Sequence, residues 1–206
     1  MAKRLLLYLI FLCAGVCLRA QEGSSALFSV EMVQDSLASY PADIRNELRL
    51  LRVLYMDFDG KTQQGVLICH RDIAEDLLDI FRQLYEARYP IERIRPISEY
   101  GNDDERSMQA NNTSCFCYRA VAGTKKLSKH AQGLAIDINP LYNPCVKRRN
   151  GRRIIQPANA TRYADRTKSF PHKITRNDLA CRLFRAKGFR WGGDWRTVKD
   201  YQHFER

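Results

Sequence analysis

The sequence contains no internal repeat and no low-complexity tract, which excludes a repeat array and a largely disordered chain. Its seven cysteines are too few for a small domain held together mainly by disulfides, and no Cys-x-x-Cys pair is present. Acidic residues are scarce, because 23 Asp and Glu stand against 34 Lys and Arg. With 45% apolar residues in 206, the composition is typical of one globular domain and excludes a collagen and a polytopic membrane protein.

The N-terminus has no apolar run long enough to span a bilayer comfortably. Residues 1–20 combine a positive start at Lys3 and Arg4, an apolar run over Leu5–Cys17 and a small residue, Ala20, at the expected cleavage site. This pattern predicts a secretory signal peptide, with a membrane anchor as the alternative. We therefore expect an exported protein, periplasmic or extracellular, without stable membrane insertion after cleavage. A basic exported chain favours anionic partners, and export argues against nucleic acid.

Five cysteines remain after the predicted cleavage, so at most two disulfides can form and one thiol stays free. We expect structural disulfides or buried thiols, and the sequence leaves the pairing open. The five are Cys69, Cys115, Cys117, Cys145 and Cys181.

The chain divides into an N-terminal linker or docking arm at 21–45 and one domain at 46–206. Short apolar runs at Val53–Phe58 and Gly65–Cys69 flank a turn-rich stretch and predict a β-hairpin. A further strand is expected at Ile91–Ile97.

Two helices are expected from capping signals and apolar spacing. Asp72 with Glu75 resembles a capping box at the start of a helix that Pro90 closes. Thr175 with Asp178 predicts the start of a second helix.

Two polar stretches, at 101–114 and 141–172, are expected as long loops, and long loops in compact domains are often functional. The second contains the basic run Lys147–Arg153. This run has no interleaved aromatic residues, so we interpret it as a solvated loop that helps to hold anionic material rather than a nucleic-acid site.

Histidine is also scarce, with four in the chain, and two of these lie in informative surroundings. Apolar residues alternate over 134–138, which predicts a strand with Asp137 on the opposite face. A bent segment before it can bring His130 beside Asp137, and a buried carboxylate needs such a partner. Gly133 and Ala135 share the face of Asp137 and leave room for something to approach closely.

His203 lies on a predicted terminal strand, with Asp200 three residues before it. Two histidines and an aspartate, His130, Asp137 and His203, form a three-ligand zinc set that leaves one position for water. Asp200 is then placed to take a proton from that water. The structural alternative is a pair of packed core histidines and a solvated aspartate.

Three segments carry a resemblance to the zinc D-alanyl-D-alanine carboxypeptidase family, and most closely to its branch of L-alanyl-D-glutamate endopeptidases. The resemblance covers about residues 90–206. It implies cleavage of peptidoglycan stem peptides and an α+β fold, shared with hedgehog signalling domains, in which a small antiparallel sheet with flanking helices carries the zinc. The segments are Ser128-x-His130-x-x-Gly133-x-Ala135-x-Asp137-Ile138, Trp191-Gly192-Gly193-Asp194-Trp195 and Asp200-x-x-His203-Phe204-Glu205.

The resemblance implies a role for each matching residue. His130, Asp137 and His203 are implied as ligands of one zinc ion, and Asp200 as the general base. Arg119 is implied to polarise the scissile carbonyl, and a fixed cation there would stabilise the developing oxyanion. Its structural alternative is a surface cation on a strand.

Three further residues are implied as substrate contacts, and each has a structural alternative. Ser128 can instead form a turn, Asp194 can instead order its loop, and Trp195 can instead pack in the core. His70 and His172 match nothing in the family and are expected on the surface.

The sequence therefore predicts an exported, monomeric zinc peptidase, most similar to an L-alanyl-D-glutamate endopeptidase. One alternative is a D,D- or L,D-carboxypeptidase that trims the end of the stem. A second is a zinc-stabilised cell-wall-binding module without turnover, against which the presence of Asp200 and Arg119 argues. A third is an exported basic nucleic-acid binder.

Overall fold

A computed structural model describes residues 27–33, 37–121 and 123–206. The predicted signal peptide at 1–20 lies outside these residues, and the predicted arm at 21–45 is described only in part. Within the described ranges, no helix combines the length and the apolar character that crossing a membrane requires.

The fold is mixed α+β, as expected, but its strands form several small sheets rather than one. In the described residues these are three three-stranded antiparallel sheets and one parallel pair. The sheets are β1(Ser29–Met32)-β2(Leu48–Met56)-β3(Thr62–His70), β10(Lys199–Asp200)-β7(Cys145–Arg149)-β8(Arg152–Gln156), β6(Ala135–Asp137)-β11(His203–Glu205)-β9(Arg190–Trp191) and β4(Arg93–Ile94)-β5(Asn112–Thr113).

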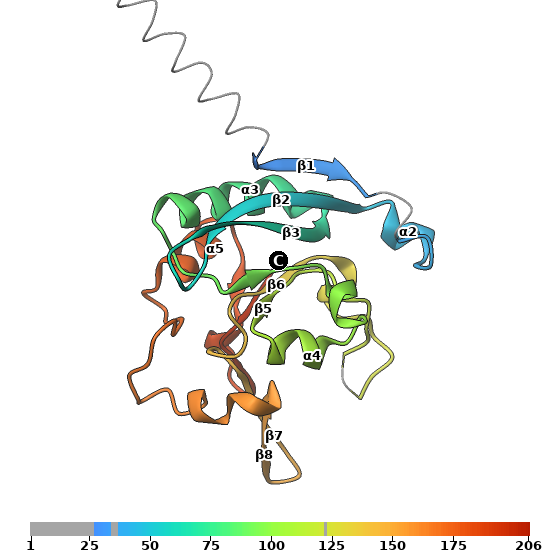
Figure 1. The fold of residues 1–206 in the computed structure, drawn as a ribbon. Helices are drawn as coiled ribbons and strands as arrows, with labels where there is room; N and C mark the ends of the chain where they lie inside the picture. The colour runs from blue at the N-terminus through green and yellow to red at the C-terminus, as the bar shows by residue number, and fades with distance from the viewer. Residues whose placement is uncertain (1–26, 34–36, 122) are drawn as a thin grey trace, which may run out of the picture.

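The helices are short except for α3. The α-helices are α2(Ala42–Arg45), α3(Arg71–Glu86), α4(Asp104–Gln109) and α5(Leu179–Ala186), and the 3-10 turns are η2(Ile97–Tyr100), η3(His130–Gln132), η4(Ala158–Tyr163) and η5(Gly192–Asp194). In Figure 1, α3 and the β1–β2–β3 sheet form the upper part of the molecule, and the β7–β8 hairpin projects from its lower end.

The predicted hairpin is confirmed, because β2 and β3 pair antiparallel along their whole length. Helix α3 packs against β2 and α5 through an apolar face that is fully buried. This face carries Ile73, Leu77, Ile80, Phe81 and Leu84. The apolar spacing that predicted the helix is therefore the spacing of its contact with the core.

The predicted caps need correction. Helix α3 begins two residues earlier than expected, so His70 rather than Asp72 is its N-cap, and it accepts a hydrogen bond from the Asp72 amide at 3.1 Å. His70 is therefore enclosed rather than on the surface, with a side chain 17% exposed. Asp178 caps α5 through its own side chain, which accepts from the Ala180 amide at 2.9 Å. His172 is half-buried, and its ring stacks on Phe58 with centroids 3.6 Å apart.

Both predicted loops contain regular structure. Residues 101–114 include α4 and β5, and Asp103 caps α4 by accepting a hydrogen bond from the Arg106 amide at 3.1 Å. Residues 141–172 include the β7–β8 hairpin and η4. The basic run hides this hairpin in the sequence, because its charged side chains replace the alternating apolar residues by which strands are recognised. The strand expected at 91–97 is confined to β4.

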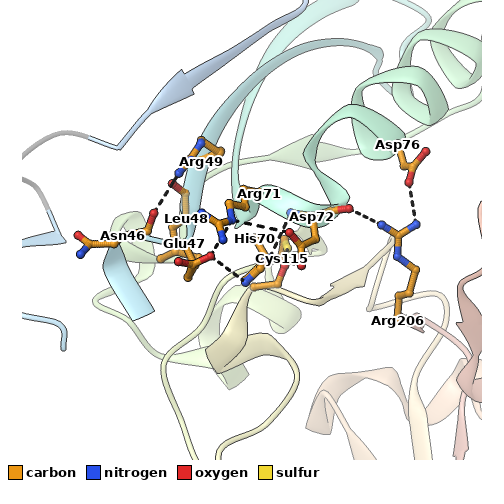
Figure 2. A network of polar contacts seen from close by, with 11 residues as sticks. Asn46, Glu47, Leu48, Arg49, His70, Arg71, Asp72, Asp76, Cys115 and Arg206 are labelled. Atoms are coloured by element: carbon orange, nitrogen blue, oxygen red, sulfur yellow. Dashed lines mark hydrogen bonds and ion pairs between the residues drawn. The ribbon is translucent and has the colours of Figure 1, made fainter. Parts of the chain in front are cut away.

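The junction between β3 and α3 is tied to the segment that contains η3. Glu47 lies between Arg71 and His70, with an Arg71 Nε–Glu47 Oε2 distance of 2.7 Å (Figure 2). The His70 amide donates a hydrogen bond to the Gly133 carbonyl at 2.8 Å. A Cβ on Gly133 would lie 2.6 Å from that amide nitrogen. The close approach expected at Gly133 is thus made by the protein's own backbone and leaves no room for a ligand.

All five cysteines of the described residues are buried free thiols. Burial raises the pKa of the Cys115 thiol well above its ordinary value. Of the two expectations, disulfides or buried thiols, the structure shows the second.

We predict that Gly133→Ala destabilises the protein more than Gly151→Ala. Both glycines have positive φ, +69° and +74°, so each substitution carries about 1–2 kcal/mol of backbone strain. Only Gly133 is also crowded, which adds about 1–3 kcal/mol, whereas nothing lies within 4 Å of a Cβ at Gly151. Urea unfolding measures both free energies, and equal losses would show that the contact with β3 is not tight.

Candidate metal centre and its cavity

Strands β6 and β11 bring two of the predicted ligands together. Their antiparallel register places His203 directly opposite Asp137. Directly opposite residues point to the same face of a sheet, so these side chains meet. The distance between His203 Nδ1 and Asp137 Oδ1 is 3.1 Å.

His130 reaches the same point from the turn η3. Its Nε2 lies 3.4 Å from Asp137 Oδ2 and 3.1 Å from His203 Nδ1. One ligand-type atom from each of the three residues lies within 4.8 Å of the other two, and all three side chains are buried. The structure therefore assembles the three predicted ligands into one cluster.

The outer partners of the imidazoles fix which nitrogens face the cluster. His130 Nδ1 lies 2.6 Å from the Cys115 carbonyl, which can only accept, so this nitrogen carries the proton. His203 Nε2 lies 3.3 Å from Glu205 Oε2, which likewise calls for a donor. The remaining nitrogens then present lone pairs to each other and to Asp137. Such a set of two imidazoles and a carboxylate fits a zinc ion.

The electrostatics favour positive charge at this point. Burial by itself lowers the pKa of His203, but hydrogen bonds to Asp137 and Glu205 raise it to about 10. Burial opposes ionisation of Asp137, yet His130 and His203 hold the pKa of this carboxyl well below its usual range. Either a proton on one of the histidines or a divalent cation can supply this positive charge. Protons and the cation therefore compete for the same nitrogen atoms.

The cluster opens into a cavity of about 490 Å³. Charged and polar side chains line it together with apolar ones, as in sites that orient a substrate through a few polar groups. The lining residues are Asp104, Met108, Arg119, Ala120, Val121, Ser128, Lys129, His130, Asp137, Cys145, Lys147, Gln156, Trp195, Val198, Asp200, Gln202, His203 and Glu205.

Asp200 lies in this cavity, as its predicted role requires. It stands on β10 directly opposite Cys145 of β7. Its Oδ1 is buried and has no hydrogen-bond partner in the described part of the chain. Burial raises the pKa of Asp200 to about 6, which brings it closer to the range of an effective general base.

Arg119 also lines the cavity, held by a residue that the sequence analysis missed. Its Nε lies 2.9 Å from Asp104 Oδ2, and the Asp104 side chain is 20% exposed. Burial raises the pKa of Asp104, and the Arg119 charge opposes that rise. The sequence indicated Asp104 only as part of a long polar stretch. No sequence pattern relates its position to that of Arg119.

The three predicted substrate contacts have different outcomes. Trp195 lines the cavity, with its ring centroid 5.2 Å from that of His203. Ser128 lines it too, but its Oγ accepts a hydrogen bond from the Ala131 amide at 3.1 Å and so stabilises the turn. Asp194 is outside the lining and forms an ion pair with Arg176 at 2.7 Å. The structure therefore supports the structural alternative for Asp194.

A comparison with known protein families supports the resemblance that the sequence segments indicated. A family model described as D-alanyl-D-alanine carboxypeptidase matches residues 122–206. The resemblance is confirmed over this part of the chain, and the match supports a zinc peptidase of the D-alanyl-D-alanine carboxypeptidase type. The match contains the three-residue cluster, whereas Asp104 and Arg119 precede it. No solved structure matches the chain.

We predict that zinc binding requires each member of the cluster. His130→Ala, Asp137→Ala and His203→Ala should each reduce bound zinc from about one per chain to a small fraction, because two ligands hold it far more weakly. His172→Ala is the control, since this histidine stacks on Phe58 away from the cluster. Atomic emission after desalting measures the metal. Full zinc in a ligand variant would remove that residue from the set.

Proposed function

We propose that this chain is a zinc peptidase that hydrolyses peptide bonds in peptidoglycan stem peptides, most similar in action to an L-alanyl-D-glutamate endopeptidase. The coarser part, a zinc peptidase of the carboxypeptidase type, has the support of the family match. The finer part rests on the motifs and on the contents of the cavity.

One observation carries the proposal: a buried carboxylate oxygen without a partner shares a cavity with the His130–Asp137–His203 cluster. A metal-stabilised binding module has no use for such an oxygen, and leaving it unpaired costs stability. A hydrolase needs it as a proton acceptor. The observation therefore favours catalysis over the non-catalytic alternative.

Several residues of the cavity have distinct roles in the proposed hydrolysis. When bound by the cluster, zinc supplies Lewis-acid polarisation and lowers the pKa of a water molecule. Asp200 accepts a proton from the attacking water and returns it to the departing amine. Arg119 donates hydrogen bonds to the carbonyl oxygen as negative charge develops there. Trp195 forms a wall that helps to exclude bulk water.

The two enzymatic alternatives differ in what the cavity recognises. A D,D- or L,D-carboxypeptidase must bind the terminal carboxylate of the stem, whereas an endopeptidase must accept chain on both sides of the scissile bond. The sequence resemblance favours the endopeptidase. We further propose that the protein acts after export as a monomer, on the basis of the N-terminal sequence pattern and the nature of this substrate.

The test is digestion of defined muropeptides with the mature protein, with and without a chelator, read by mass spectrometry. Chelator-sensitive cleavage supports the proposal, and the fragment masses identify the bond. Intact muropeptides in the presence of zinc-loaded protein would overturn it.

We predict that Asp200→Asn lowers the rate of cleavage by at least about 10²-fold, because an amide cannot accept the proton. Bound zinc should remain at about one per chain. Asp194→Asn is the control and should leave the rate within about twofold, since Asp194 is paired with Arg176 outside the cavity. Loss of zinc in Asp200→Asn would make Asp200 a ligand instead.

We predict that Asp104→Asn lowers kcat about tenfold with a smaller change in KM, because Arg119 loses the charge that holds it in place. Asp103→Asn is the matched control: it alters the adjacent carboxylate, which caps α4 and does not line the cavity. Steady-state kinetics and thermal unfolding separate the two effects. If both variants lose kcat equally, the loss follows from damage to α4.

A further inference from the structure

The register of the β7–β8 hairpin defines one face that runs outward from the cavity. Cys145 pairs with Gln156, and Arg149 pairs with Arg152 at the far end. Residues two apart on a strand and residues directly opposite each other share a face. Lys147 therefore shares this face with all four. Cys145, Lys147 and Gln156 line the cavity, so this face is the one turned toward it.

Lys147 forms no ion pair with a carboxylate of the described residues, although it lines the cavity. Arg119, by contrast, is paired with Asp104. The Nζ of Lys147 instead donates to Gln156 Oε1 at 2.7 Å, a neutral acceptor. Two of its three N–H donors remain for another group.

The outer end of the same face repeats this excess of positive charge. Arg149 and Arg152 are exposed and directly opposite each other, an arrangement that destabilises a hairpin. Neither forms an ion pair with any residue that the structure describes. An anionic ligand along this face would relieve the repulsion.

We propose that this face of the hairpin binds an acidic peptide, with Lys147 holding a carboxylate next to the scissile bond and Arg149 and Arg152 interacting with anionic groups farther along the ligand. The inference rests on the proposed function and adds a substrate class to it. The carboxylate has two possible sources, the side chain of an acidic residue and the C-terminus of the stem. The first suits an endopeptidase and the second a carboxypeptidase.

The experiment combines three peptides with three variants. The peptides are a stem peptide with a free glutamate carboxylate and a free C-terminus, the same peptide with the glutamate carboxyl amidated, and the same peptide with the C-terminus amidated. The variants are Lys147→Gln, Lys147→Arg and Arg148→Gln. Arg148→Gln is the matched control, because this substitution removes one positive charge from the opposite face of the same strand.

For the unmodified peptide, Lys147→Gln should raise KM about 10- to 100-fold with little change in kcat, the range expected for a charged hydrogen bond. Lys147→Arg should restore most of the affinity, and Arg148→Gln should change KM less than threefold. With the peptide that lacks the recognised carboxylate, wild type and Lys147→Gln should be alike. The peptide that shows this equality identifies the source of the carboxylate.

Binding is measured separately by calorimetry in an Asp200→Asn background, where we expect turnover to be at least about 10²-fold slower. There the same pattern should appear in Kd. The double variant Arg149→Gln/Arg152→Gln should bind more weakly than the wild type at low salt, and high salt should remove this difference.

Equal effects of Lys147→Gln and Arg148→Gln would overturn the proposal, as would an effect of Lys147→Gln that is the same for all three peptides. Duplex DNA affinity that depends on Arg149 and Arg152, with peptide binding unchanged, would also overturn it. Failure of the wild type to cleave any peptide would instead count against the proposed function.

Discussion

The pairing of β6 with β11 is the constraint on which the rest of the site depends. It sets His203 opposite Asp137, and a slip of one residue would turn His203 to the other face. The register is held by burial: Phe204 pairs with Ile136 on the opposite face, and its ring stacks on Phe184 with centroids 4.4 Å apart. Core packing on one face thus fixes the chemistry on the other.

His130 is not on a strand and needs a different support. Its Nδ1 is fixed by the Cys115 carbonyl, and the turn that carries it is pressed against the end of β3 through Gly133 and His70. Cys115 and His70 both precede residue 122, where the family match begins. The N-terminal part of the domain therefore holds in place His130, which belongs to the matched part.

The sequence predicted what local patterns encode. Alternation over 134–138 predicted the strand, and the segments that resemble the peptidase family predicted His130, Asp137 and His203, because short-range periodicity and a fixed ligand set are visible in a sequence. It did not predict Asp104 beside Arg119, since that contact depends on where α4 packs. It also misjudged Gly133, because a missing side chain does not reveal whether a ligand or the protein's own backbone fills the space.

Two cations that line the cavity differ in their partners. Arg119 is neutralised by Asp104 within the protein, so it contributes a fixed direction more than a net attraction. Lys147 has only the neutral Gln156 side chain as a partner among the described residues, so its charge is available to a ligand. The hairpin that carries Lys147 pairs through β7 with β10, the strand that carries Asp200. Substitutions farther out on that hairpin therefore lie outside the elements that hold His130, Asp137 and His203 together, which are η3, β6 and β11.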